Sequence, residues 1–500
     1  MKKLTDTREK RATLNIIVSL FCQCLTLICG LIVPKLMIET FGSEAYGATA
    51  SIAQFLAYIA LLEGGIGGVA RAALYKPLAE NNIQVISEIV NEITRFFRII
   101  AYIFTGYVLV LACGFYKLSH IECFDWLNTF LLVIVISIST FAQYFIGISY
   151  SVLIQAAQKT YITNIVNIFT IILNTILIII LIKLKSNLIL VKLVSSCVFV
   201  LRPIILYRYV FHNFKILTPQ KNSCNYLSQK WDGLGQHIAY FLYYNTDIAI
   251  LTIFYNLKAV AVYSVYNMVI SQVYNLTTSF STGMEAFFGE LIAKNECEEL
   301  HKVFGYYENL ISLISLVMFS STAVLIMPFI QIYTKSVEDV NYIEPLFAIL
   351  FILSTLITCL RSPYHNLTIA AGHFKQTQWA AYGEAFINII LSAVLVINLG
   401  LVGVVIGTLI ATAFRMLFYA FYLTTHIFNR KIQLFIKREF VNIGMFFLIF
   451  IIGRSICNVW DFSGYGTWII CAIIVTLIAI IISFLGNYIC YRNDFKLIIK

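Results

Sequence analysis

The chain has 500 residues, of which 60% are hydrophobic and only 12% are charged, and its formal net charge is +10. Soluble globular proteins have roughly a quarter of their residues charged, so this composition excludes soluble enzymes and binding domains and predicts a protein embedded in lipid. The positive charge does not require a nucleic acid partner, because lysines and arginines on the inner side of a membrane face anionic lipid. The 12 cysteines show no CxxC pair or other zinc-ligand spacing, so no metal site is expected.

A helix needs about 20 apolar residues to cross a bilayer. The chain contains fourteen such runs, which predicts an all-α polytopic membrane protein with about fourteen transmembrane helices. The basic first 13 residues precede a long apolar run without a small-residue cleavage site, so the first run is expected to be a retained helix. The predicted spans are 14–34, 46–70, 97–116, 126–147, 161–182, 187–211, 233–254, 260–283, 305–333, 344–368, 376–398, 401–427, 439–460 and 466–490.

Lysine and arginine in the connections predict the orientation, because positively charged loops stay on the cytoplasmic side. Most of these residues lie inside when the N-terminus is placed in the cytoplasm, and fourteen spans then return the C-terminus to the same side. The long connections around 71–96, 213–232, 284–304 and 428–438 all become cytoplasmic. The loops predicted to lie outside are short, so we expect no large external domain.

The sequence repeats itself at an offset of 214 residues. Tyr150 and Ala156 after the fourth predicted span recur as Tyr364 and Ala370 after the tenth, and the helix starts show the same offset. Six helices per copy bring both copies in from the cytoplasm, so the duplication is parallel, and such halves commonly move cargo through the space between them. The predicted parts are an N-terminal six-helix lobe (1–212), a cytoplasmic linker (213–232), a C-terminal six-helix lobe (233–428) and two additional helices (429–500).

Polar stripes at helical spacing mark the first two helices of each repeat. A helix facing lipid is apolar all round, so these stripes are expected to face protein or water. Hydrogen bonding between packed helices explains any one of them. Their recurrence at equivalent places favours a hydrated cavity lined by Asn15, Ser19, Gln23, Gln54, Tyr58, Tyr240, Tyr244, Asn267, Ser271 and Asn275.

Three arginines lie inside predicted spans, where a charge costs about 3 kcal/mol even on the insertion scale. Arg202 and Arg415 occupy nearly equivalent positions of the two repeats, Arg361 lies in the tenth span, and Arg71 ends the second span. The planar guanidinium suits a phosphate or diphosphate, so these four are the candidate anion-binding residues. The alternative is that Arg202 and Arg415 reach to the interface or pair with Glu384 or Glu308.

Three carboxylates lie deep within predicted spans: Glu63, Asp247 and Glu384. Each is either a structural partner of an arginine or a site where Na⁺ or H⁺ is coupled to transport. The stripe around Asp247 favours a cavity role for that residue, and the nearby arginines favour ion pairing for Glu384. The glycine cluster 64–68 indicates close helix approach or a bend in the second span.

Two stretches carry a family resemblance. Phe41–Gly47 running into Leu61–Arg71, and Asn245–Leu251 followed by Ala259–Asn267, resemble the second helix and the seventh and eighth helices of bacterial polysaccharide flippases of the Wzx type. These belong to the multidrug/oligosaccharidyl-lipid/polysaccharide exporter (MOP) superfamily. The resemblance implies a V-shaped pair of helical bundles in the bacterial cytoplasmic membrane. It also implies alternating access, with arginines such as Arg202, Arg361 and Arg415 holding the diphosphate of an undecaprenyl-diphosphate-linked oligosaccharide.

The resemblance implies a role in surface polysaccharide assembly, such as O-antigen or exopolysaccharide, with membrane lipid, a polymerase and glycosyltransferases as partners. No catalytic triad, Walker loop or metal motif is present in the sequence, so we expect a transporter that is not an enzyme and has no cofactor beyond a coupling Na⁺ or H⁺. Two alternatives stay open. A cation-coupled multidrug exporter of the same superfamily would need an acidic cavity, and a membrane-bound glycan transferase or polymerase would need a catalytic motif or a large outer loop.

Overall fold

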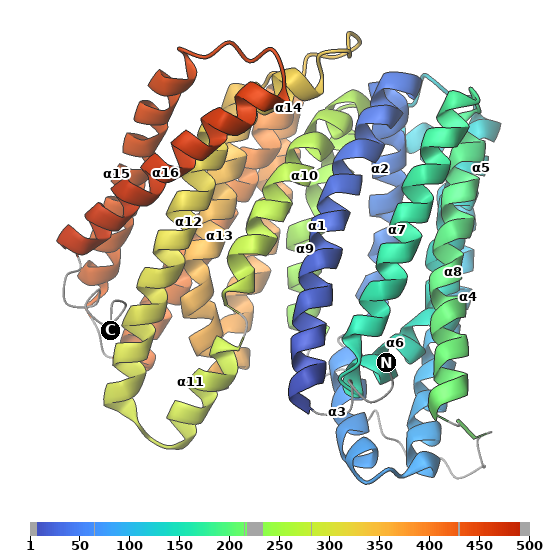
Figure 1. The fold of residues 1–500 in the computed structure, drawn as a ribbon, viewed down its shortest axis with the longest axis horizontal. Helices are drawn as coiled ribbons and strands as arrows, with labels where there is room; N and C mark the ends of the chain where they lie inside the picture. The colour runs from blue at the N-terminus through green and yellow to red at the C-terminus, as the bar shows by residue number, and fades with distance from the viewer. Residues whose placement is uncertain are drawn as a thin grey trace. The chain divides into compact units, whose positions relative to one another are not determined.

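The computed structural model describes residues 8–64, 66–214, 216–217, 234–281, 283–428 and 431–490. Every regular element in these residues is a helix (Figure 1). The chain divides into two compact units: unit 1 comprises Met1–Phe241 with Asn256–Ala261, and unit 2 comprises Leu242–Tyr255 with Val262–Lys500. The predicted linker 213–232 lies mostly outside the described residues.

Unit 1 is organised around one long central helix, α4, whose Phe97, Phe104 and Phe115 are fully buried. Apolar side chains from the neighbouring helices complete a single continuous core. The elements up to the linker are α1 (Arg8–Phe41), α2 (Ser43–Ala57), the short helix η1 (Tyr58–Glu63), α3 (Ile66–Ala79), α4 (Ile83–Ser119), α5 (Trp126–Ala142), η2 (Gln143–Gly147), α6 (Ile148–Ala156), α7 (Thr160–Lys183) and α8 (Leu188–Phe214).

Unit 2 has the same plan around α12, and two further helices pack beside it. α13 packs against both α12 and α14, while α15 and α16 pack against α12. The elements after the linker are α9 (Leu234–Phe254), α10 (Leu257–Ser279), α11 (Met284–Ala293), α12 (Cys297–Tyr333), α13 (Pro345–Ala370), α14 (Phe374–His426), α15 (Ile432–Cys457) and α16 (Tyr465–Cys490).

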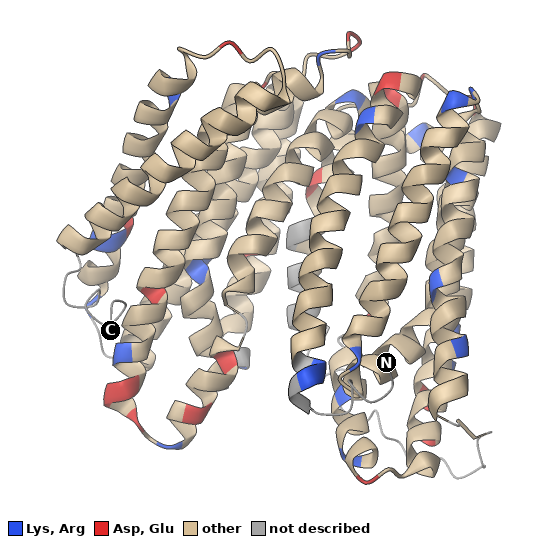
Figure 2. Cartoon of the chain, viewed as in Figure 1, with Lys and Arg blue, Asp and Glu red and all other residues tan. Residues whose placement is uncertain are grey.

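The structure confirms an all-α polytopic membrane protein. Eleven helical segments of the described residues are long and apolar enough to cross a membrane, and one of them, α14, contains two of the predicted spans. The remaining two predicted spans are the helices α9 and α10. Large apolar side chains such as Val110 and Phe386 are 74% and 67% exposed, as expected of a surface that faces acyl chains. Charged residues concentrate towards the helix ends (Figure 2).

The internal duplication is confirmed by the backbone. α4 and α12 each have 37 residues, and their first residues, Ile83 and Cys297, are 214 positions apart. Asn81 and Asn295, at the same offset, both adopt a left-handed conformation, with φ of 52° and 58°. Such backbone angles are uncommon outside glycine, so their recurrence shows that the two copies share local geometry as well as helix spacing.

α14 is a helical hairpin. Its backbone leaves the helical conformation at Gly400, where φ is 54° and ψ is −131°. The two halves then run antiparallel in close contact, because a Cβ on Gly403 would lie 2.3 Å from the carbonyl oxygen of Leu395, and one on Gly407 would lie 2.3 Å from Ser392 Oγ. The separate spans predicted at 376–398 and 401–427 are therefore these two halves.

The second predicted span, 46–70, is broken. Its helical course ends at Glu63, Gly64 adopts φ 56°, and α3 begins at Ile66. Of the two roles predicted for the glycine cluster, the bend is present. Close helix approach is not seen at Gly67 or Gly68, because a Cβ on either would meet no heavy atom within 4 Å.

One predicted boundary was wrong in a way that matters for the site. The span predicted to begin at residue 439 is α15, which begins at Ile432. Arg438, assigned from the sequence to a cytoplasmic connection, therefore lies inside a helix and is only 2% exposed. The prediction failed because the charges around Lys437 and Arg438 look like a loop when their partners cannot be seen.

Candidate functional site

A buried charge cluster in unit 2 joins two of the predicted arginines. Arg361 on α13 donates from Nη1 to Glu384 Oε1 at 2.5 Å, and Arg415 donates from Nη1 to the other carboxylate oxygen of Glu384. Glu384 is on the first half of the α14 hairpin and Arg415 is on the second half, so the hairpin at Gly400 brings them together. All three side chains are buried, with Glu384 fully inaccessible.

The charges of this cluster do not balance. One carboxylate faces two guanidinium groups, which leaves a net charge of +1 within the cluster. Arg415 Nε is buried and has no hydrogen-bond partner. The cluster continues through Tyr419, whose hydroxyl lies 3.1 Å from His365 Nδ1. A buried donor left over from an ion pair is costly, and an anion is the group that would satisfy both the spare donor and the spare charge.

Unit 1 carries a weaker version of the same arrangement. Arg202 on α8 donates from Nε to Thr170 Oγ1 at 2.7 Å and lies over the ring of Phe199, 4.4 Å from its centroid. Thr170 is the repeat counterpart of Glu384, and Gly147 is the counterpart of Arg361. The first repeat therefore keeps one arginine but lacks the second arginine and the carboxylate.

A second polar cluster of unit 2 surrounds Asp247 on α9. Tyr263 donates its hydroxyl hydrogen to Asp247 Oδ2 at 2.9 Å, and Thr408 Oγ1 lies 3.1 Å from the same oxygen. The hairpin adds Asn388, whose Oδ1 accepts from Ser392 Oγ at 2.9 Å. These side chains are all buried in the apolar interior of the unit.

The oxygens in this cluster outnumber the hydrogens available to them. Thr408 Oγ1 has one hydrogen to donate, yet it lies within 3.4 Å of both Asp247 oxygens, of Asn388 Oδ1 and of the Val404 carbonyl oxygen. A carboxylate, an amide oxygen, two hydroxyls and a backbone carbonyl form a ligand set suited to a small cation such as Na⁺, or to a proton shared with the carboxylate. The cluster is thus a candidate cation site.

The fold does not require this cluster. The repeat counterparts of Asp247, Ser392 and Thr408 in unit 1 are Val33, Ile178 and Val194, and only Asn388 has a polar counterpart, Asn174. The same helices are built in unit 1 with apolar residues. Since burying polar groups is costly, their concentration in one repeat points to a function.

Two other predicted residues have protein partners in unit 1. Glu63 accepts from the hydroxyl of Tyr144, which lies on the irregular helix η2. Arg71 donates from Nη1 to Gln155 Oε1 at 2.8 Å and joins α3 to α6. Arg71 and Arg202 belong to unit 1, whereas Arg361 and Arg415 belong to unit 2, so the four candidate arginines form at least two separate groups.

The sequence gave no indication of a second buried ion pair. Arg438 on α15 pairs with Glu308 on α12 and donates from Nη2 to Asn309 Oδ1 at 2.6 Å, and Tyr364 on α13 also donates to Glu308. Asn442, one turn further along α15, accepts from Ser312 Oγ at 2.9 Å. This network ties α15 to the six-helix bundle. The only available signal was the spacing of Arg438 and Asn442, which share one helix face.

The predicted cavity-lining residues have mixed environments. Asn15 donates to the Gln158 carbonyl oxygen at 3.0 Å and accepts from the Tyr161 backbone amide, which is the interhelical bonding given as the alternative. Ser19 and Asn275 are exposed, and the others with described side chains are half-buried: Gln23, Gln54, Tyr58, Asn267 and Ser271. The side chains of Tyr240 and Tyr244 lie outside the described part of the structure. Whether these residues line a cavity stays a prediction.

No protein-family model and no curated protein sequence matches the chain. Solved structures do share its fold. The lipid II flippase MurJ, in an inward closed conformation, is 18% identical with a TM-score of 0.67, over 96% of this chain and 99% of that one. A multidrug resistance MATE family transporter of the MOP superfamily, inward-facing, is 13% identical with a TM-score of 0.57, over 82% and 98%. A eukaryotic MATE transporter is 11% identical with a TM-score of 0.56, over 83% and 95%.

These likenesses define the class of the protein. The chain is a multi-pass membrane protein with the fold of MOP-superfamily flippases and transporters, and the likeness to MurJ extends over nearly the whole of both chains. At these identities the fold is shared, while substrate and partners have to be argued from the residues of this chain.

Proposed function

We propose that the protein is a flippase that moves an undecaprenyl-diphosphate-linked oligosaccharide across the bacterial cytoplasmic membrane by alternating access. The observation that carries this proposal is the buried Arg361–Glu384–Arg415 cluster, with its net positive charge and its unpartnered Arg415 Nε. A diphosphate offers the acceptors that this donor lacks, and guanidinium groups bind phosphate oxygens with well-matched geometry. Arg71 and Arg202 are the candidates for phosphate contacts in unit 1.

Transport in this scheme is coupled to a cation at Asp247. Binding of Na⁺ or H⁺ there neutralises a buried carboxylate and organises oxygens from α9 and from both halves of the α14 hairpin. The same hairpin carries Glu384 and Arg415, so the cation and the proposed anion act on one element. No chemical bond of the cargo changes, and the helices carry the head group while its lipid tail stays in the bilayer.

A multidrug exporter is the second candidate, favoured by the shared MATE fold and by the buried acidic residue Asp247. It is the weaker one, because drugs exported by a cation-coupled mechanism are mostly cationic and would be repelled by an arginine cluster.

Complementation separates the two functions. The gene is expressed in a strain that lacks its surface-polysaccharide flippase, and in a drug-sensitive strain without exporters. Restored surface glycan without drug resistance supports the flippase. Drug resistance without glycan would overturn it.

A sharper test combines Arg361→Gln with Arg415→Gln, and uses Arg454→Gln, an arginine in the last turn of α15, as the control. We expect at least about a tenfold loss of export for the double variant at matched protein levels, since each lost charged contact removes about 1.5–3 kcal/mol. Unchanged export would remove these two arginines from the proposed site.

A further inference from the structure

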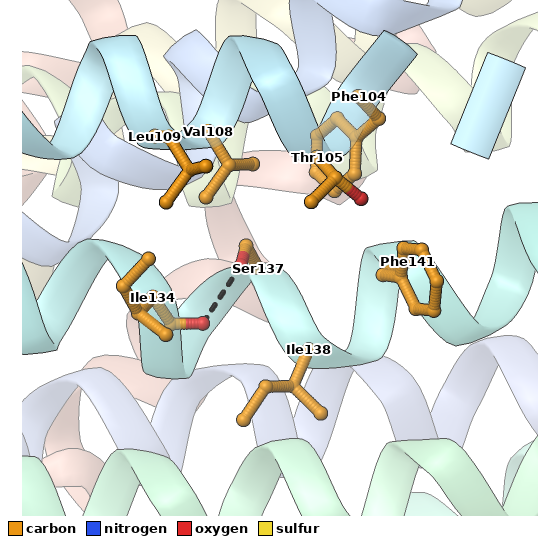
Figure 3. Close-up of a pocket in the computed structure, with 8 residues that line it drawn as sticks. All are labelled: Phe104, Thr105, Val108, Leu109, Ile134, Ser137, Ile138 and Phe141. Carbon is orange, nitrogen blue, oxygen red and sulfur yellow. Dashed lines mark hydrogen bonds between the residues drawn. The ribbon is translucent and has the colours of Figure 1, made fainter. Parts of the chain in front are cut away.

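An apolar groove in unit 1 lies apart from all the residues discussed so far. It runs between α4 and α5, has a volume of about 250 Å³, and is open to the surface of the unit. Figure 3 shows side chains of the two helices meeting along it. The lining residues are Phe104, Thr105, Val108, Leu109, Ile134, Ser137, Ile138 and Phe141.

The groove offers nothing to a polar ligand. Its two hydroxyl groups are already bonded to their own helices, Thr105 to the Ala101 carbonyl oxygen at 3.0 Å and Ser137 to the Ile134 carbonyl oxygen at 2.7 Å. The remaining lining atoms are hydrocarbon. A flexible apolar chain therefore fits this groove, and a sugar or a charged group does not.

One end of the groove leads to a cation. Phe141 stacks on Phe145 with ring centroids 5.4 Å apart, and the Arg98 guanidinium lies 5.2 Å from the centroid of Phe145. Arg98 and Thr105 are seven residues apart, so they share one face of α4 and are separated by about 10 Å along its axis. Arg98 is exposed, and the structure records no ion pair for it within the residues that it describes.

We propose that this groove is a binding site for an anionic diacyl phospholipid, with one acyl chain between α4 and α5 and the phosphate at Arg98. The expected topology places Arg98 at the inner edge of the third span, which is the depth of a lipid headgroup in the cytoplasmic leaflet. The half-exposed aromatic stack at Phe145 fixes the guanidinium at the mouth of the groove. Binding of this lipid is independent of the cargo, and it would hold for a flippase or an exporter alike.

The test measures lipid binding to the purified full-length protein by native mass spectrometry. The probes are phosphatidylglycerol and phosphatidylethanolamine with identical acyl chains. Arg98→Ala should weaken phosphatidylglycerol binding about fivefold and abolish the preference for it, since one basic residue near a membrane surface contributes about that factor. Lys117→Ala, which removes the same charge from the last turn of α4, should leave the preference unchanged.

A second pair of variants tests the groove itself. Thr105→Trp puts a large side chain into the groove and should reduce binding of both lipids, whereas Ile103→Trp, at an exposed position on another face of α4, should not. Equal binding of the two lipids by the wild type, or equal effects of Arg98→Ala and Lys117→Ala, would overturn the proposal. Displacement of phosphatidylglycerol by one equivalent of a polyprenyl diphosphate would also overturn it and assign the groove to the cargo.

Discussion

At the scale of single residues, the buried charges of this protein are held by partners that differ between its two repeats. Arg202 has a neutral threonine as its hydrogen-bond acceptor, whereas Arg415 shares a carboxylate with Arg361. A buried charge is costly unless it is paired, so the energetic role of each residue depends on what remains when it is removed.

The Arg361–Glu384–Arg415 cluster gives an ordered prediction of stability. Glu384→Gln leaves two buried guanidinium groups without a counter-charge and should lower the free energy of unfolding by about 3–5 kcal/mol. Arg415→Gln leaves the neutral pair of Arg361 and Glu384 and should cost clearly less. Thermal unfolding of the purified variants in one detergent measures the order, and an Arg415→Gln protein less stable than Glu384→Gln would contradict the assigned pairing.

The Asp247 cluster predicts a difference between two equivalent asparagines. Asn388→Ala removes an oxygen of the candidate cation site and should raise the dissociation constant of the coupling cation about tenfold, which corresponds to about 1.4 kcal/mol. Asn174→Ala, the same change at the counterpart position in unit 1, should leave it unchanged. Isothermal titration with Na⁺, and with protons followed by a pH indicator, measures both. Equal effects of the two substitutions would show that Asn388 has only a packing role.

At the scale of the elements, the helices that position the charges are the irregular ones. α14 reverses at Gly400, the second span breaks at Gly64, and the span from Trp126 to Ala156 widens locally at η2. Regular helices satisfy their own backbone groups in lipid, so an interruption needs a compensating structure around it. In α14 that structure is the close packing of its two halves, which brings Glu384 and Asn388 against Arg415 and Thr408.

The α14 hairpin therefore predicts an effect of adding single methyl groups. Gly407→Ala would place a Cβ 2.3 Å from Ser392 Oγ and 2.6 Å from its backbone nitrogen, so the halves must separate. We expect the yield of folded protein and its thermal stability to fall, and transport to fall with them.

Gly444→Ala on α15 is the matched control, because a Cβ there meets no heavy atom within 4 Å. Alanine is favoured over glycine inside a helix by about 1 kcal/mol, so this variant should be as stable as the wild type or more stable. Size-exclusion chromatography after heating compares the two. Loss of folded protein from Gly444→Ala but not from Gly407→Ala would refute the hairpin packing.

At the scale of the whole molecule, the protein consists of two copies of one helical plan with different interiors. The backbone offset is maintained from α4 and α12 to the left-handed residues Asn81 and Asn295. The polar clusters are not maintained, because unit 2 has Asp247 and Glu384 where unit 1 has Val33 and Thr170. Unit 2 also receives α15, which is fixed to α12 through Arg438 and Glu308.

The charge distribution predicts the topology of the whole chain. Single cysteines introduced at Lys294 in the α11–α12 connection should react with an impermeant maleimide only after the membrane is opened, since this connection is expected in the cytoplasm. Cysteines introduced at Asn458 in the α15–α16 connection should react in intact cells. The measurement uses a variant without its native cysteines, and the opposite labelling pattern would invert the predicted orientation.

The sequence by itself determined the membrane class, the number of spans within a residue or a few at most ends, and the duplication. These follow from apolar runs and spacing, which are local properties that lipid solvation imposes on any spanning helix. It also marked Arg361, Arg415, Glu384 and Asp247 as costly charges that require an explanation.

Only the tertiary structure decided which groups those charges meet. Glu384 is 23 residues from Arg361 and 31 from Arg415, and no local pattern specifies that one carboxylate serves both. The Arg438–Glu308 pair was missed altogether, because its members are 130 residues apart and a charged residue near a helix end looks like loop. Contacts between helices depend on side-chain direction and packing, so they become visible only when the helices are assembled.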